Sequence, residues 1–207
     1  MTGIMHTFDG VAGRIDAIGA RSLGFTSAVA GEGVTTVALG TAMALAAIRD
    51  DGVLLVDANW LSPALTADAG LRSHAGLAEL LAGTADPGSV IVASRQERLG
   101  IVPIGDRGAS RPALRSLAAL LARDIPGYAT VIVDLPPVLA GEAYVLPWTA
   151  VLDHLFVVLR EGATPLPVAR SALERIGIAA PQVILNRAAP TGSALPASLL
   201  ARVRERA

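Results

Sequence analysis

Short apolar runs alternate along the chain with longer segments rich in Ala and Leu. Runs that are apolar at almost every position predict strands buried on both faces, and the Ala- and Leu-rich segments predict helices. The predicted strands cover residues 22–29, 52–58, 99–105, 129–138, 154–162 and 182–188. The predicted helices cover residues 35–49, 76–83, 111–124, 165–176 and 196–207.

This alternation of strands and helices predicts an α/β fold. Successive parallel strands need right-handed crossover connections, so helices come to cover both faces of the sheet. The expected architecture is therefore a three-layer sandwich around a mainly parallel sheet. No repeat, low-complexity tract or linker divides the 207 residues. We expect a single domain over residues 1–207, with about residues 1–20 as an N-terminal extension.

The composition narrows the functional classes. The chain is 52% hydrophobic and 17% charged, which is typical of a folded protein rather than a disordered one. A net charge of -1 argues against broad nucleic-acid binding, which needs concentrated positive charge. The chain has no cysteine, which fits a reducing cytoplasm. Its N-terminus lacks the basic segment and apolar run of a secretory signal, so we expect a cytoplasmic protein.

A glycine-rich loop is the first candidate for chemistry. In the segment AGEGVTT, residues 30–36, Gly31 and Gly33 allow backbone N–H groups to point into one concave nest. The helix that follows adds the positive end of its dipole, which favours a bound phosphate. Thr35 stands where a hydroxyl would bind the Mg²⁺ of a nucleotide. A glycine-rich turn without any ligand is the alternative for this loop taken alone.

Two acids follow apolar strands and are the second candidate. Asp57 ends the run GVLLVD and Asp134 ends the run ATVIVD. Ligands of open parallel sheets bind at the carboxyl ends of the strands, so both acids are expected beside the glycine-rich loop. A buried carboxylate is costly unless it has a partner or a task, and a metal-bound water is one such task. A helix N-cap is the alternative for each acid taken singly.

These motifs, in this order, resemble the cytoplasmic P-loop domain of bacterial tyrosine kinases of the Wzc, CapB and CpsD type. Those kinases belong to the MinD/ParA-like group of ATPases and act in capsule and exopolysaccharide production. The resemblance extends from about residue 22 to residue 206 and implies a P-loop NTPase-like fold. It rests on the segments TSAVAGEGVTT, VLLVDANWLSP, GLAELLAGTADPGSVI, LGIVPIGDRGASRPALRSL, VIVDLPPVLAGEAYVL and VILNRA.

The resemblance implies a role for each matching position. Asp57 would be the residual catalytic residue, and Asn186 would contact the adenine edge. Mg²⁺ or its waters would be held by Thr35, Asp57 and Asp134. The implied cofactor is ATP or ADP with Mg²⁺, weakly bound. The phosphates would be lined by Gly31, Glu32, Gly33, Val34, Thr35 and Thr36.

The sequence also departs from the family at positions that matter for catalysis. Val34 replaces the lysine that follows the last glycine of the loop, and all 17 basic residues of the chain are arginine. Asn59 replaces the second acid of the VDAD motif, and Leu61 and Ser62 stand where basic residues are usual. The tail LARVRERA holds no tyrosine for autophosphorylation.

Together these features predict a catalytically degenerate pseudokinase or pseudo-ATPase. It would act as a cytoplasmic partner or regulator in exopolysaccharide synthesis or export. The implied partner is an inner-membrane protein of the polysaccharide co-polymerase type, which would bring the chain to the membrane periphery. The chain could also form a homo-oligomer.

Two alternatives stay open. The first is an active ATPase or tyrosine kinase in which an arginine, from this chain or a neighbour, replaces the lysine. Arg107 and Arg111 follow a strand end and could approach phosphates, or could mark a solvated helix start. The second is a MinD/ParA-like positioning ATPase, for which residues 198–207 would form a basic amphipathic membrane anchor. The competing interpretation of that segment is a final helix packed on the sheet.

Overall fold

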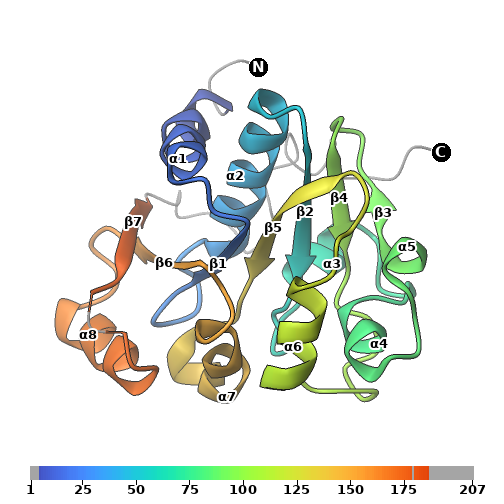
Figure 1. Ribbon diagram of the computed structural model, residues 1–207. Helices are drawn as coiled ribbons and strands as arrows, with labels where there is room; N and C mark the ends of the chain where they lie inside the picture. The colour runs from blue at the N-terminus through green and yellow to red at the C-terminus, as the bar shows by residue number, and fades with distance from the viewer. Residues whose placement is uncertain (1–4, 179, 187–207) are drawn as a thin grey trace.

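The computed structural model describes residues 5–178 and 180–186, and its centre is a seven-stranded sheet (Figure 1). The strand order is β3-β4-β2-β5-β1-β6-β7, and every neighbouring pair is parallel except β3 with β4. The strands are β1 (Ser22–Thr26), β2 (Gly52–Asp57), β3 (Val92–Ala93), β4 (Leu99–Val102), β5 (Tyr128–Asp134), β6 (His154–Arg160) and β7 (Gln182–Asn186).

Helices cover both faces of this sheet, as predicted from the alternation of strands and helices. They are α1 (Met5–Ile18), α2 (Val34–Ile48), α3 (Ala64–Asp68), α4 (Leu77–Ala82), α5 (Pro87–Val90), α6 (Leu114–Leu121), α7 (Val138–Thr149) and α8 (Leu166–Arg175). The predicted three-layer α/β sandwich with a mainly parallel sheet is confirmed.

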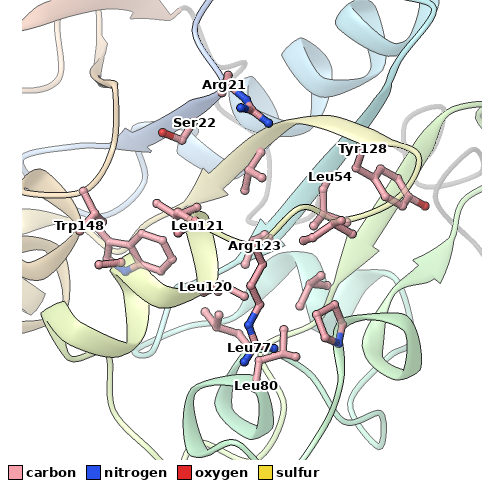
Figure 2. Close-up of a pocket in the computed structure, with 18 of the residues that line it drawn as sticks. Arg21, Ser22, Leu54, Leu77, Leu80, Leu120, Leu121, Arg123, Tyr128 and Trp148 are labelled. Carbon is pink, nitrogen blue, oxygen red and sulfur yellow. The ribbon is translucent and has the colours of Figure 1, made fainter.

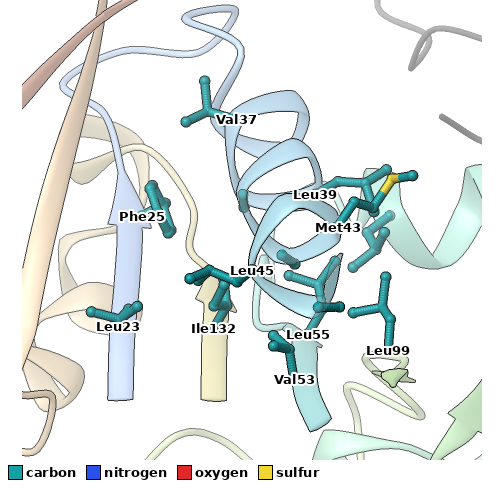
Figure 3. Packing of buried hydrophobic residues seen from close by; sticks show 14 of the residues in the cluster. Leu23, Phe25, Val37, Leu39, Met43, Leu45, Val53, Leu55, Leu99 and Ile132 are labelled. Carbon is teal, nitrogen blue, oxygen red and sulfur yellow. The ribbon is translucent and has the colours of Figure 1, made fainter. Parts of the chain in front are cut away.

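One face of the sheet is covered by α1 and α2. Figure 3 shows the side chains that pack between α2 and the strands. Leu23, Val53 and Ile132 project from three neighbouring strands toward Leu45 of α2, and all four side chains are buried. Helix α2 is apolar around most of its circumference, as expected for a helix that lies between a sheet and another helix.

Helix α1 contributes to this core. In α1, Ala12 and Ile15 are buried against the cluster that α2 forms with the sheet. The Phe8 ring lies directly over Gly40 of α2, where a Cβ atom would come within 2.4 Å of the ring. A glycine at this position therefore permits the close approach of the two helices.

The opposite face is covered by α4, α6, α7 and α8. Its core contains Leu54, Val133 and Val157 from the strands, with Leu77 of α4 and Trp148 of α7. Side chains thus alternate between the two faces along β2, β5 and β6, as strand geometry requires.

Helix α7 was not among the predicted elements, nor were α1, α3, α5 and β3. The segment of α7 contains Pro147, follows two prolines, and has non-helical backbone angles at Gly141 (φ −140°, ψ 38°). These residues break the helical pattern in the sequence, although the structure accommodates them as a kink. The helix predicted over residues 196–207 lies outside the described residues.

Candidate nucleotide-binding site

Two carboxylates lie side by side at the carboxyl ends of the central strands. Strands β2 and β5 are neighbours, and their register pairs Asp57 with Asp134. Both residues are fully buried, with 0% of their surface exposed. The placement predicted for the two acids at one edge of the sheet is therefore what the fold produces.

Asp57 is held by three hydrogen bonds that tie it to the following loop. Its Oδ2 accepts from the backbone N–H of Thr66 (2.8 Å) and from the Thr66 hydroxyl (2.7 Å), and its Oδ1 accepts from the N–H of Asn59 (3.1 Å). Burial raises the pKa of Asp57 to about 6, and these bonds together with the charge of Arg107 oppose the rise. Thr66, which the sequence did not single out, also accepts from the N–H of Ile104 (2.9 Å).

Asp134 is different, because neither of its carboxyl oxygens has a hydrogen-bond partner of normal geometry among the described residues. Burial, together with the charge of Asp57, raises the pKa of Asp134 well above its ordinary value. The hydroxyl of Thr35 lies near enough to oppose that rise. A buried carboxyl without partners calls for a ligand, since such a group is costly when it stays alone.

The glycine-rich loop connects β1 to α2 beside these acids. Gly31 and Gly33 have φ angles of 86° and 88°, in the left-handed region that glycine adopts without strain. Within the described chain, the N–H groups of residues 31–36 make no hydrogen bond, and the first helical bond runs from the N–H of Val37 to the carbonyl of Gly33 (3.0 Å). Unbonded N–H groups at a loop and helix N-terminus form the nest that binds phosphate.

The base of the loop is fixed to the segment that follows β5. The Thr26 hydroxyl donates to the carbonyl of Pro136 (2.7 Å), and the N–H of Val138 donates to the carbonyl of Ser27 (2.8 Å). The glycine-rich loop and the Asp134 strand end are therefore held together by the first residues of α7.

Glu32 does not point its side chain toward the nest. The residue is 2% exposed, and its carboxylate accepts hydrogen bonds from the N–H of Arg160, the last residue of β6, and from the hydroxyl of Thr164, which follows β6. The side chain thus anchors the loop, and only the Glu32 backbone remains available to line phosphates. The sequence gave no signal for Thr164 as its partner.

Asn186 lies at the same loop. Its Nδ2 donates to the carbonyl of Glu32 (3.0 Å), and a Cβ atom at Gly33 would come within 2.3 Å of that nitrogen. In the structure the Asn186 amide therefore packs against the backbone of the glycine-rich loop at Glu32 and Gly33. Its predicted contact with adenine stays a prediction.

Val34, at the position of the usual lysine, is the first residue of α2 and is buried against the α2 side of the core. Thr35 and Thr36 follow it in the first turn and are partly exposed.

Arg107 contacts the loop that contains Asn59. Its Nη1 donates to the carbonyl of Trp60 (2.8 Å). Arg107 is exposed, as considered for a solvated residue, but it does not start a helix, because α6 begins only at Leu114 and the guanidinium contacts the acidic motif.

The donor set fits Mg²⁺. This ion prefers oxygen ligands and is commonly held by one or two carboxylates, waters and substrate phosphates. Asp134 offers two unpartnered oxygens, and Thr35 and Asp57 add a hydroxyl and a second carboxylate nearby. Among the described residues no group of three or more His, Cys, Asp or Glu forms a metal cluster, so the protein alone would not complete the coordination shell.

No protein-family profile and no curated protein matches the chain in sequence. Solved structures do match. The VpsO kinase domain is 24% identical with a TM-score of 0.73, covering 90% of this chain and 95% of that one. The kinase domain of Escherichia coli tyrosine kinase ETK is 23% identical with a TM-score of 0.67, covering 84% and 71%. The septum site-determining protein MinD from Pyrococcus horikoshii OT3, solved with Mg-ADP, is 22% identical with a TM-score of 0.65, covering 89% and 77%.

The chain therefore has the P-loop NTPase-like fold that bacterial tyrosine kinase domains share with MinD and ParA ATPases. The predicted resemblance is confirmed at the level of the fold. No helix in the described ranges is both long enough and apolar enough to cross a bilayer.

Proposed function

We propose that this protein is a catalytically degenerate relative of the bacterial tyrosine kinases that binds ATP or ADP with Mg²⁺ weakly. It acts as a cytoplasmic partner or regulator in exopolysaccharide synthesis or export. The observation that carries the proposal is Val34, a buried apolar residue at the first position of α2, beside an otherwise complete nest. The protein keeps the parts that hold a nucleotide and lacks the cation that would stabilise transfer of its phosphoryl group.

Loss of the lysine is expected to affect nucleotide affinity and the rate of turnover to different extents. Loss of one charge-assisted hydrogen bond costs roughly 1.5–3 kcal/mol, or about one to two decades of affinity. The backbone N–H groups of residues 31–36 and the helix dipole are independent of that lysine. Turnover suffers further, because loss of one donor that stabilises developing charge costs about 10² to 10³ in rate. Binding therefore survives in weakened form, and turnover falls far below that of an enzyme with the lysine.

The residues that would hold Mg²⁺ are Asp134 and Thr35, with Asp57 acting through a water. When bound, the ion supplies positive charge that neutralises the phosphates. Asp134 then has a function that explains its burial without a hydrogen-bond partner. Asp57 is largely engaged by Thr66 and Asn59, so its role is to orient rather than to react.

The tyrosines also favour a non-catalytic role. The chain has two, Tyr128 and Tyr144. The Tyr128 hydroxyl lies against Gly100 of β4, and the Tyr144 ring stacks on Trp60 with centroids 6.3 Å apart. Both rings are packed within the fold, and neither is presented as a flexible acceptor for phosphorylation.

Calorimetry with ATP and ADP, with and without Mg²⁺, tests the proposal on the wild type, Val34→Lys and Val34→Met. We expect weak Mg²⁺-dependent binding by the wild type, about one to two decades tighter binding by Val34→Lys, and no gain in Val34→Met, which adds length without charge. Turnover of ATP by the wild type at the rate of active kinases of this type, or phosphorylation of its own tyrosines, would overturn the degenerate assignment. Failure to co-purify with a polysaccharide co-polymerase-type membrane protein would count against the assigned partner.

One observation favours the active alternative. The guanidinium of Arg107 binds the carbonyl of Trp60, and its charge lowers the pKa of Asp57 against the effect of burial. An arginine so close to the acidic motif is a candidate for the substitute cation. ATP hydrolysis by the wild type that disappears in Arg107→Gln and persists in Arg111→Gln would establish this alternative.

A further inference from the structure

A cavity of about 440 Å³ lies between the sheet and the helices α4 and α6, remote from the glycine-rich loop (Figure 2). Its volume is within the range of small-molecule sites. Its apolar walls include Leu54 and Val131 of the sheet, Leu77 and Leu80 of α4, Leu121 of α6 and Trp148 of α7.

The cavity exists because α6 does not seat its apolar face on the sheet. Leu117 is the one residue of α6 that is fully buried, although Leu120 and Leu121 also lie on the side that lines the cavity. Strand β5 is the fourth of seven strands, yet Val131 in its middle is only half-buried. The space opens to solvent, because Leu120, Leu121 and Val131 are partly exposed, and it is large enough to admit a small ligand.

One wall of this space is aromatic. Trp148 lines the cavity and is fully buried, with 0% exposure. Figure 2 shows its indole extending from one wall toward Leu121. The Nε1 atom itself is buried, so Trp148 contributes an apolar ring to the wall.

A positively charged side chain, Arg123, lies at the rim of the cavity. Arg123 lines the cavity, is exposed, and makes no ion pair or side-chain hydrogen bond with the described residues. The acid in the lining, Asp153, is already engaged, because it accepts from the N–H groups of Arg21 (2.9 Å) and Ser22 (2.8 Å). The rim therefore offers a positive charge to a ligand, and the walls offer apolar surface.

We propose that this cavity binds a small anionic amphiphile. Its apolar chain lies under α6 along Leu54 and Val131, and its carboxylate pairs with Arg123. The site is separate from the glycine-rich loop and independent of the proposed nucleotide binding.

Calorimetry with sodium decanoate below its micellar concentration tests the proposal, with octanoate and decanol as comparisons. We expect one saturable site per chain. Each methylene removed should weaken binding about fourfold, so octanoate should bind roughly 15-fold more weakly than decanoate. Arg123→Gln should weaken decanoate binding about three- to fivefold and leave decanol binding unchanged. Absence of binding, or many weak sites typical of surfactants, would overturn the proposal.

Two variants at neighbouring positions locate the site. Ala118 lines the cavity and Ala119 does not, although both are exposed residues of α6. Ala118→Phe should abolish decanoate binding, whereas Ala119→Phe should bind like the wild type. Equal decanoate binding by the two variants would overturn the assignment of the site to this cavity. If Ala118→Phe does not fold, the site is tested by Arg123→Gln, which should weaken binding of decanoate but not of decanol.

Discussion

Replacement of Asp134 by Asn is expected to stabilise the nucleotide-free protein while removing its response to Mg²⁺. Asp134 is fully buried, has no hydrogen-bond partner among the described residues and lies beside Asp57. At neutral pH the unfolded chain ionises both carboxyls freely. The folded protein instead has to hold a buried charge or retain a proton against its ordinary pKa.

The magnitude follows from Asp57, whose pKa rises from 3.8 to about 6. At about 1.4 kcal/mol per pKa unit, this rise corresponds to roughly 3 kcal/mol of lost stability at neutral pH. The pKa of Asp134 is also raised, by burial and by repulsion from Asp57. An Asn amide removes the charge but leaves an unsatisfied donor that costs about 1–3 kcal/mol. We expect a net gain of about 1 kcal/mol, or a melting temperature higher by roughly 2–4 °C for a chain of this size.

The pH dependence has a defined sign. Because the folded-state pKa of each acid is raised, the folded state binds more protons than the unfolded state, and wild-type stability falls as the pH rises above about 4. For Asp57 the loss accumulates between 3.8 and about 6. The difference in melting temperature between Asp134→Asn and the wild type should therefore be largest near neutral pH and close to zero near pH 4.

The assay is thermal melting in EDTA from pH 4 to pH 8, followed by melting with Mg-ADP. Asp51→Asn removes the same charge from an exposed position and should melt like the wild type. Mg-ADP should raise the melting temperature of the wild type but not of Asp134→Asn. An Asp134→Asn variant that melts at or below the wild-type temperature in EDTA at neutral pH would refute the reasoning, since the carboxyl would then be satisfied without a ligand.

Three further changes test the surrounding structure. Glu32→Gln should lower the free energy of unfolding by about 1.5–3 kcal/mol, because it weakens the charge-assisted hydrogen bonds from Arg160 and Thr164. Unfolding in denaturant measures this loss. An unchanged midpoint would contradict the anchoring role of Glu32. Gly52→Ala places a Cβ atom 2.1 Å from the Gly127 carbonyl and should cost about 1–3 kcal/mol or more, whereas Gly10→Ala meets nothing within 4 Å and should not destabilise. Burial raises the pKa of Asp153, but hydrogen bonds from Ser22 and Arg21 outweigh this effect and lower it. Asp153→Asn should therefore have a lower melting temperature than the wild type at pH 7. In melts over a pH series, this difference should disappear below about pH 4.

The layers of the fold and the placement of the acids were predictable from the sequence because both follow from backbone rules. A strand that is apolar throughout has to be covered on both faces, and parallel strands bring their carboxyl ends to one edge. Asp57 and Asp134 were therefore placed correctly without knowledge of any contact. Helix α7 was missed because Gly141 and Pro147 interrupt the pattern that identifies a helix.

The partners within the site were not predictable, since they come from residues far apart in the chain. Glu32 meets Thr164 across 132 positions, and Asn186 meets the Glu32 carbonyl across 154. The sequence motif places a glutamate in the loop but does not say whether its carboxylate faces phosphate or the end of β6. That choice depends on the β6–α8 connection, whose sequence carries no signal for a contact with the loop.

The same contacts bear on the meaning of Val34. The buried Asp134 has no partner among the described residues, and such a carboxyl is costly in an empty protein. The Glu32 and Asn186 contacts hold the glycine-rich loop in its observed shape without help from a lysine. The proposal that this protein responds to a nucleotide without turning it over therefore does not require the missing lysine for the shape of the loop.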